Sequence, residues 1–468
     1  MKTLIWVPLL ASLAASCPGP RARPGIPAQH LLLVTVAGLR ADHTSAWQYH
    51  RPTTYTEIDG GLRAAGRAVA LDDLAAEGVM FAHTFAPSGD TDVALASMLT
   101  GCSPLETGIM MADGARVADK VSLAQALRAA GYRTAAFVTG ETLAGASWEA
   151  GFDVFQRGET DRDTLGNALD WAGAHDFGNG QQVLLWVHLE QPTFPFSPTE
   201  MDATLERGGV VDFAHLFTDP DYAGSADGSD AFRSAALSPG SARLEAADRD
   251  QVIALYDGDV AQADRLLQLF LDFYRYAGAS NELWERTFLV LAGVGGVELF
   301  EAGARDSRSW GETGRLSDAV LHVPLLMRHP DSLTGRRIFD HVTELQDLLP
   351  TVLEWAQVAR PDGLPGRSLL RITDRAGSGF VARAAFGCRG SDGQIEALTA
   401  RDERWRLIWT PAAEHPLELI DQVADPLALD NLADQRPDVV ERLRAQLDAW
   451  LESGKRRPGL DLTAFGQG

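Results

Sequence analysis

A threonine between two aspartates, Asp90-Thr91-Asp92, stands directly before a stretch of helical pattern, Ala94 to Leu99. A threonine hydroxyl attacks an ester only when a metal ion or a base activates it. The two carboxylates would repel an anionic substrate at this place. Aspartate and threonine also cap the free N–H groups at the start of a helix, and we favour this structural interpretation for Asp90 and Asp92.

Glycines follow the apolar run Thr287 to Leu291, in the order Gly293-Val294-Gly295-Gly296. A glycine-rich turn after a strand is one part of a dinucleotide-binding loop. The spacing of the third glycine does not fit such a loop, and no acidic residue follows at the distance at which a ribose would be bound. The sequence therefore does not predict a dinucleotide site.

Four continuous apolar runs have the length of strands that are buried on both faces of a parallel sheet. Helical patterns lie between them, so the sequence predicts a doubly wound, mostly parallel α/β sheet with helices on both faces. The runs are His30 to Val36, Thr134 to Val138, Val183 to Val187 and Thr287 to Leu291, and the helical patterns are Leu71 to Glu77, Ala94 to Leu99, Leu123 to Ala130 and Gln251 to Tyr276.

The pattern changes toward the C-terminus. Short alternating runs, Trp405 to Trp409 and Leu417 to Ile420, predict a small antiparallel sheet, and Pro437 begins a helix that continues to about Leu451. We therefore expect an α/β domain over residues 30–375 and a C-terminal subdomain over residues 376–468. Within the first domain, residues 197–247 are rich in Gly, Ser, Asp and Ala, which predicts a long acidic surface excursion.

The N-terminus has the order of a secretory signal peptide over residues 1–17: a lysine, an apolar run and then small residues before Cys17. A tether rich in Pro, Gly and Arg follows over residues 18–29. A cysteine after small residues resembles a bacterial lipobox, which would make Cys17 a lipidated membrane anchor; ordinary signal cleavage is the alternative. We expect an exported protein, in the periplasm or at the outer membrane as a lipoprotein, and otherwise secreted.

The net charge of −23 argues against nucleic acid as a partner, because phosphate contacts need a basic surface. No segment after the signal peptide is long and apolar enough to cross a bilayer. Cys102 and Cys388 could pair in an oxidising compartment or remain two buried thiols, and no two cysteines have the spacing of zinc ligands.

Short blocks along residues 30–452 resemble, in order and spacing, those of the sulfatase family, which has an alkaline-phosphatase-like fold. The first, Leu32 to His43, resembles the first strand and its acidic turn. The other blocks are Arg51 to Thr54, Leu71 to Val79, Ala86 to Ser88, Ala96 to Gly101, Val187-His188 with Pro192, Tyr256 to Asp259 with Asp264, Val323 to Leu326, Leu348 to Leu353, Gly363 to Leu369, and Asp425-Pro426 with Asn431-Leu432.

The resemblance implies a site in which carboxylates and an amide or imidazole hold a divalent cation, usually calcium, that stabilises charge on the sulfate ester. Here the two ligand pairs fall on Ala37 and Gly38 and on Val294 and Gly295, none of which has a side-chain oxygen. The family's nucleophile is a formylglycine made from Cys or Ser. The corresponding place, ten residues before Gly101, is Thr91, which cannot be converted by that route.

The resemblance also places several polar residues near the strand ends. Asp42 is expected to pair with Arg40 or to cap a turn. His188 is expected to make a structural hydrogen bond at a strand end, and His322 to make a surface or domain contact. Glu298 follows the late strand, where we expect a solvated turn carboxylate in preference to a stand-in metal ligand.

Two hypotheses remain. The first is a non-catalytic, sulfatase-like envelope protein that acts by binding or interaction, with no cofactor and with an unknown protein or glycan partner. The second is an active hydrolase of sulfuric or phosphoric esters with Thr91 at the nucleophile position. It requires a Ca²⁺ ion held by substitutes such as Asp42, Asp90, Asp92 or Glu298.

Overall fold

The computed structural model of this protein describes residues 30–54, 70–108, 120–143, 146–175, 177, 180–202, 210–238, 241, 244–276, 282–301, 310–311, 316–330, 332–370, 382–391, 394–426 and 428–454. The expected signal peptide over residues 1–17, Cys17 and the tether over residues 18–29 lie outside these ranges. No helix in the described ranges has the length and hydropathy needed to cross a membrane.

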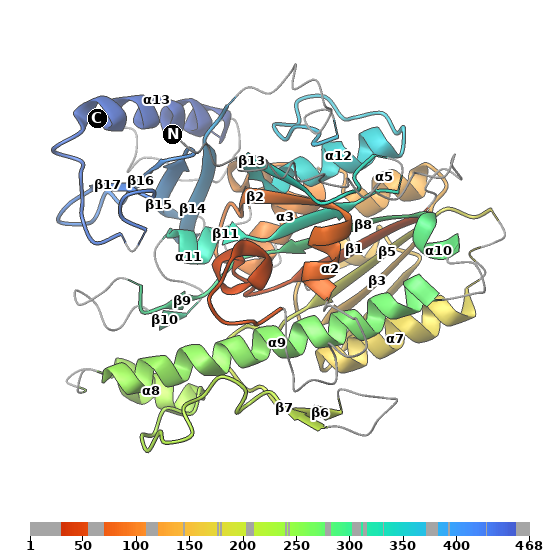
Figure 1. Cartoon of the computed structure of the whole chain (residues 1–468). Coiled ribbons are helices and arrows are strands. Elements are labelled where there is room, and N and C mark those ends of the chain that lie inside the picture. Colours follow the sequence, from red (N-terminus) through yellow and green to blue (C-terminus); the bar gives the residue numbers. More distant parts are fainter. Residues whose placement is uncertain are drawn as a thin grey trace, which may run out of the picture.

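Within the described residues, nine strands form a mostly parallel sheet at the centre of the molecule (Figure 1). β1 lies in the middle and pairs in parallel with β5 on one side and β8 on the other. All residues of these three strands are buried, as their continuous apolar sequences predict. The strands are β11 (His322–Val323), β2 (Val79–Phe85), β12 (Leu325–Arg328), β8 (Thr287–Gly293), β1 (His30–Val36), β5 (Val183–Leu189), β3 (Arg133–Thr139) and β4 (Val154–Gly158), with β13 (Arg337–Glu344) paired to β2.

Helices cover both faces of the sheet, as predicted. Alternate residues of β1 point to opposite faces, so Leu32, Val34 and Val36 share one core cluster while Leu31 and Leu33 share the other. The first face is covered by α2 (Ala70–Glu77), α7 (Asp161–Ala174) and α9 (Ala246–Tyr276), and the second by α3 (Thr91–Thr100), α5 (Leu123–Ala129) and α12 (Leu348–Trp355).

The remaining elements are short and connect or flank the main ones. They are the helices α4 (Pro104–Thr107), α6 (Ala146–Glu149), α10 (Glu282–Glu285) and α11 (Asp318–Leu321), the 3₁₀ turns η1 (Ala41–His43), η2 (Ser45–Trp47) and η4 (Leu345–Asp347), and the strands β9 (Glu298–Leu299) and β10 (Trp310–Gly311).

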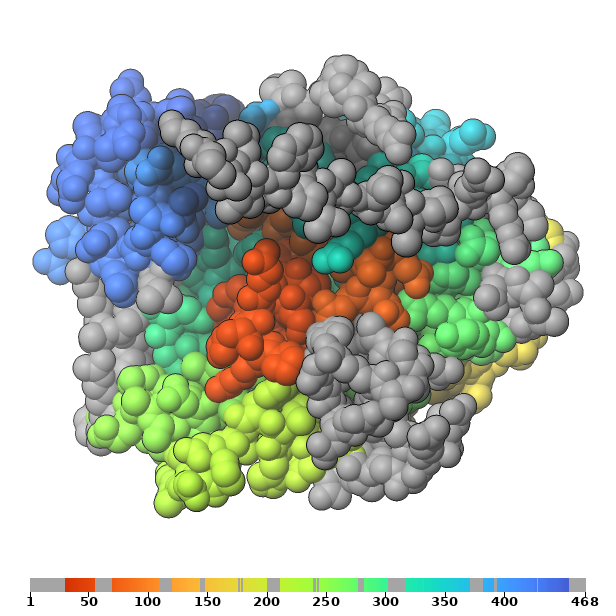
Figure 2. Space-filling model, viewed as in Figure 1, coloured from red at the N-terminus to blue at the C-terminus, as the bar shows by residue number. Residues whose placement is uncertain are grey.

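The predicted excursion over residues 197–247 contains β6 (Glu200–Asp202), β7 (Val210–Asp212) and α8 (Asp230–Leu237), and it lies along α9 on the side away from the sheet (Figure 1). Its Phe213 is buried in the same core cluster as α9. The backbone N–H of Ser197 donates to Asp259 Oδ2 of α9 at 3.0 Å. These contacts fasten the segment to α9. On the face drawn in Figure 2, it borders the red segment of residues 30–54.

The C-terminal subdomain has the predicted antiparallel sheet and helix. Its strands, in spatial order, are β14 (Ala385–Ser391), β15 (Gln394–Arg401), β16 (Trp405–Trp409) and β17 (Leu417–Asp421), and α13 (Pro437–Gly454) packs on them. Cys388 of β14 and Cys102 of the α/β domain are both buried and are not joined by a disulfide bond.

Buried ion pairs connect the two parts of the chain. Arg383, just before β14, pairs with Asp347 and lies 3.2 Å from Glu344. Arg401 and Arg406 of the C-terminal sheet reach Asp318 of α11 at 3.1 Å and 3.2 Å. Because Glu344 and Asp347 are almost fully buried, removing Arg383 would leave uncompensated charge in the interior.

We therefore expect Arg383→Met to lower the free energy of unfolding by about 3 kcal/mol, measured by urea denaturation. The matched control is Arg436→Met, which removes an exposed pair with Asp438 and should have a much smaller effect on stability. Equal effects of the two substitutions would contradict a stabilising role for the buried pairs.

Candidate functional site

The carboxyl ends of β1 and β8 lie side by side at one edge of the sheet. Val36 is aligned with Gly293 in the parallel pair, and the N–H of Val294 donates to the carbonyl of Val36 at 3.0 Å. Ala37 and Gly38 therefore follow one strand directly beside Val294 and Gly295, which follow the other.

The start of α3 reaches the same edge. A Cβ atom placed on Gly295 would lie 3.1 Å from the carbonyl oxygen of Gly89, two residues before Thr91. The structure thus brings together the five residues that the sequence singled out: Ala37, Gly38, Thr91, Val294 and Gly295.

The donor chemistry of this edge does not fit a calcium ion. Calcium takes six to eight oxygen ligands, several of them anionic. Ala37 and Val294 are buried in the apolar cluster on the α3 side of the sheet, and Gly38 and Gly295 have no side chain. In the part of the chain that the structure describes, no three His, Cys, Asp or Glu side chains are arranged to hold a metal ion.

The acids beside Thr91 have structural partners. Asp90 is the N-cap of α3, and its Oδ1 accepts a hydrogen bond from the N–H of Val93 at 3.1 Å, which confirms the capping interpretation. For Asp92 that interpretation is wrong. Its buried Oδ1 instead accepts from the N–H of Leu143 at 2.9 Å and so holds the turn that follows β3. Thr91 itself is half-buried as the first residue of α3.

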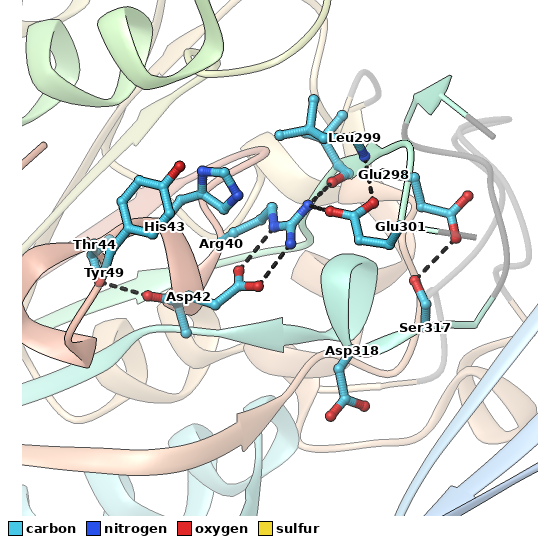
Figure 3. Close-up of polar contacts among 12 residues, drawn as sticks. Arg40, Asp42, His43, Thr44, Tyr49, Glu298, Leu299, Glu301, Ser317 and Asp318 are labelled. Carbon is cyan, nitrogen blue, oxygen red and sulfur yellow. Dashed lines mark hydrogen bonds and ion pairs between the residues drawn. The ribbon is translucent and has the colours of Figure 1, made fainter. Parts of the chain in front are cut away.

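Arg40 joins the turn after β1 to the segment after β8 (Figure 3). Its guanidinium donates to both Asp42 oxygens at 2.9 Å and 2.7 Å and to the carbonyl of Val297 at 2.9 Å, and it also pairs with Glu301. Burial alone would lower the pKa of Arg40, but Asp42 and Glu301 raise it above its ordinary value. The expected pairing of Asp42 with Arg40 is confirmed, and the arginine remains charged.

Glu298 is not the solvated turn carboxylate that the sequence suggested. It is 1% exposed, in β9, which pairs with β10. The hydroxyl of Ser317 donates to its Oε1 at 3.1 Å (Figure 3). The prediction failed because the two-residue strand pair and α11, which cover this carboxylate, have no periodic sequence signal.

The four carboxylates of the alternative hypothesis thus contact four different groups. Asp42 binds Arg40, Asp90 caps α3, Asp92 holds Leu143, and Glu298 accepts from Ser317. A shared cation would need these oxygens within about 2.4 Å of one point. Their partners lie on separate elements, and this distribution argues against that arrangement.

Tyr256 and Asp257 organise the residues after β1, a role that sequence reasoning missed. The hydroxyl of Tyr256 donates to the carbonyl of Gly38 at 2.7 Å and accepts from the N–H of Arg40 at 3.1 Å. Asp257 pairs with His43 at 2.7 Å, and it accepts hydrogen bonds from Tyr49 at 2.9 Å and Arg51 at 2.7 Å. The family resemblance had singled out the block Tyr256 to Asp259, but it gave these two residues no role.

His188 makes the structural hydrogen bond that was predicted. Its Nδ1 shares a 2.8 Å hydrogen bond with Thr35 of β1, while its Nε2 has no hydrogen-bond partner within the described chain. The ring is fully buried, and this burial lowers the pKa of His188 to about 3. His322 is partly buried in β11, and its Nε2 lies 2.7 Å from the carbonyl of Ala82.

A mostly parallel sheet with helices on both faces and a small antiparallel C-terminal sheet give the chain an α/β fold of the alkaline-phosphatase-like class, to which the sulfatases belong. The family model described as Sulfatase matches residues 29–358, and one described as N-sulphoglucosamine sulphohydrolase, C-terminal, matches residues 309–455. This chain belongs to the sulfatase family.

Curated relatives match only part of the chain. Arylsulfatase K of Mus musculus is 28% identical over 141 residues, which is 28% of this chain and 25% of the relative. Arylsulfatase K of Danio rerio is 31% identical over 127 residues, which is 26% of this chain and 24% of the relative. The match therefore spans about a quarter of the length of these relatives.

Solved structures share the fold over nearly the whole chain. A putative sulfatase from Bacteroides fragilis has a TM-score of 0.68 at 14% identity, covering 93% of this chain and 98% of its own. The phosphonate monoester hydrolase of Agrobacterium radiobacter has a TM-score of 0.67 at 19% identity, covering 92% and 95%. At these identities the similarity is evidence for the fold alone.

The buried His188 makes a testable contribution to acid sensitivity. The unfolded chain takes up a proton on this ring near pH 6.5, whereas the folded protein resists it until about pH 3. Above pH 6.5 this ring is therefore neutral in both states and does not affect stability. Below pH 6.5 only the unfolded chain binds the proton, so the free energy of unfolding falls by about 1.4 kcal/mol per pH unit. His188→Leu should flatten the decline of the unfolding free energy between pH 6.5 and 5 by about 2 kcal/mol.

The measurement is urea denaturation of the parent chain and of His188→Leu at several pH values. A slope that is the same in His188→Leu and in the parent chain would contradict the assignment.

Proposed function

We propose that this chain is a non-catalytic member of the sulfatase family that acts by binding or interaction. The observation that carries the proposal is the chemistry of the four strand-end positions: Ala37, Gly38, Val294 and Gly295 offer no side-chain oxygen at the edge where two neighbouring strands end. Without anionic side chains at these positions, a divalent cation lacks the ligands that the family places there, and the charge on a transferring sulfuryl group lacks a metal to stabilise it.

The surroundings of Thr91 support the same conclusion. Asp90 caps α3 and Asp92 accepts a hydrogen bond from the N–H of Leu143, so both carboxylates beside Thr91 have structural partners. Both acids also place negative charge beside the position that a sulfate or phosphate ester would approach. Family membership by itself does not supply an activity, since one fold serves many functions.

The proposal extends to the location and partners of the protein. The sequence over residues 1–17 favours export, with Cys17 as a lipid anchor and the folded part attached through residues 18–29. The net charge of −23 favours a protein or glycan partner over nucleic acid.

A second candidate, an active hydrolase, is favoured by the family itself, whose named relatives include arylsulfatase K and whose structural neighbours include a phosphonate monoester hydrolase. It would use Thr91 as the nucleophile with a calcium ion held by carboxylates other than those at the family positions. The two candidates differ in metal content and in turnover.

The test is metal analysis of the purified full chain together with assays of aryl sulfate, phosphate and phosphonate esters in the presence of calcium. We expect less than stoichiometric metal, no calcium-dependent rise in the unfolding temperature, and no turnover above the uncatalysed rate.

The deciding variant is Thr91→Ala, with Thr160→Ala as a matched control at the start of α7. Metal-dependent turnover that disappears in Thr91→Ala and persists in Thr160→Ala would overturn the proposal and establish the hydrolase.

A further inference from the structure

The segment that follows β5 is fastened by two buried carboxylates on different helices. We call residues 190–197 the strap. Asp161 of α7 accepts hydrogen bonds from the backbone N–H groups of the first two strap residues at 2.9 Å and 3.0 Å. Asp259 of α9 accepts one from the N–H of the last strap residue, Ser197, at 3.0 Å. Acidic side chains therefore hold the strap at both of its ends.

The strap lies against the turn that follows β1. A Cβ atom on Gly38 would lie 2.3 Å from the carbonyl oxygen of Pro192, in the middle of the strap, so the two backbones are in contact. Near the end of the strap, the buried ring of Phe196 packs edge-on against Tyr256 with 5.3 Å between the ring centroids. The hydroxyl of Tyr256 in turn donates to the carbonyl of Gly38. Release of the strap would therefore uncover the turn after β1.

No positive charge offsets the two carboxylates that hold the strap. Asp161 lies close enough to act electrostatically on Asp259, and within the described residues no arginine, lysine or histidine stabilises either of them. The Oδ1 of Asp259 also has no hydrogen-bond partner there, although the residue is fully buried. Two buried acids thus stand near each other without a counter-charge.

The other charges around the strap do not relieve this arrangement. Glu190, the first strap residue, adds a further negative charge beside the α7 carboxylate, and Asp92 of α3 and Glu141 of the turn after β3 act on it as well. The guanidinium of Arg233 in α8 lies over the ring of Phe194, 4.7 Å from the ring centroid, and does not act on the two buried carboxylates. The surroundings of the strap are therefore acidic.

A buried carboxylate without a counter-charge favours its protonated form. Burial raises the pKa of Asp259 well above its ordinary value, and the neighbouring Asp161 raises it further. Burial also raises the pKa of Asp161, against the lowering effect of its hydrogen bonds. Opening of the strap admits water and returns both groups toward the ordinary aspartate pKa of about 4. The closed strap therefore binds more protons than the open strap above about pH 4, and closure weakens as the pH rises.

We infer that the strap is a proton-controlled cover over the turn after β1: protonation of the buried pair Asp161 and Asp259 keeps it closed, and ionisation of the pair as the pH rises favours its opening. The inference goes beyond the proposed function, because it concerns access to this edge of the sheet and not the reaction. It applies equally to a binding protein and to a hydrolase.

The test is hydrogen–deuterium exchange of the folded full chain from about pH 5 to about pH 9, measured on peptides that cover residues 190–197. Amides that are bonded to Asp161 and Asp259 exchange only when these bonds open. After correction for the intrinsic exchange rate at each pH, we expect protection to fall by up to about tenfold per pH unit for each proton that opening releases. Protection that is independent of pH would overturn the inference.

The deciding variant is Asp259→Asn, whose amide oxygen can still accept from the N–H of Ser197 but does not ionise. Protection of the strap should then be higher at alkaline pH, and its fall with pH should be shallower than in the parent chain. The matched control is Asp264→Asn. Asp264 is also a buried carboxylate of α9 that accepts a backbone N–H, but its partner is Leu71 of α2 at 2.8 Å. This control should leave the exchange of the strap as in the parent chain.

A fall that is as steep in Asp259→Asn as in the parent chain would show that the strap opens for another reason, and the inference would fail. If Asp259→Asn does not fold, the parent chain decides, with the peptides of β1 and β5 as the internal reference that should stay protected at every pH. Loss of protection in these strands together with the strap would mean global unfolding and would also contradict a separate strap motion.

The proposed function and the strap fail on different observations. Turnover of an ester by the parent chain would overturn the non-catalytic assignment and leave the strap untouched. Exchange that does not depend on pH would remove the strap and leave the non-catalytic assignment standing.

Discussion

The parallel pairing of β1 with β5 and β8 is the constraint on which the rest of the structure depends. Parallel strands end at the same edge of a sheet, so the register that aligns Val36 with both Leu189 and Gly293 brings the residues after all three strands together. In the sulfatase family this edge carries the chemistry. Here the same register brings together alanine, valine and glycines, and it allows the backbone of neighbouring turns to approach closely.

Side chains from the helical layer and the loops fasten this edge. Tyr256 reaches from α9 to Gly38, Asp161 reaches from α7 to the turn before Pro192, and Arg40 joins the turn after β1 to Val297, just before β9. Each makes hydrogen bonds to backbone groups that would otherwise be buried and unsatisfied, which is costly in the interior. The edge is therefore stabilised by the protein's own donors and acceptors, and the fold persists without the donor set that a calcium ion would need.

The sequence predicted best those elements whose hydrophobic pattern extends over many residues. The fully buried strands β1, β5 and β8, and β3 with its one exposed residue Arg133, were predicted because a continuous apolar run is typical of a central parallel strand. The antiparallel β12 and the half-exposed β13 were not predicted. β12 has only four residues and β13 has an irregular register, so neither has a periodic pattern in the sequence. For the same reason Glu298 was expected in solvent, and Asp92 was taken for a cap when its partner, Leu143, lies 51 residues away.

By itself, the sequence determined the family, the α/β architecture with its C-terminal sheet, and the absence of side-chain oxygens at positions 37, 38, 294 and 295, because these follow from residue types and their order along the chain. Only the tertiary structure decided which groups contact one another. The partners of Arg40, Asp161 and Tyr256 come from distant segments, and the close approach of Pro192 to Gly38 depends on how three layers pack. Such contacts are set by the shapes of surfaces that exist only after the sheet and its helices have assembled.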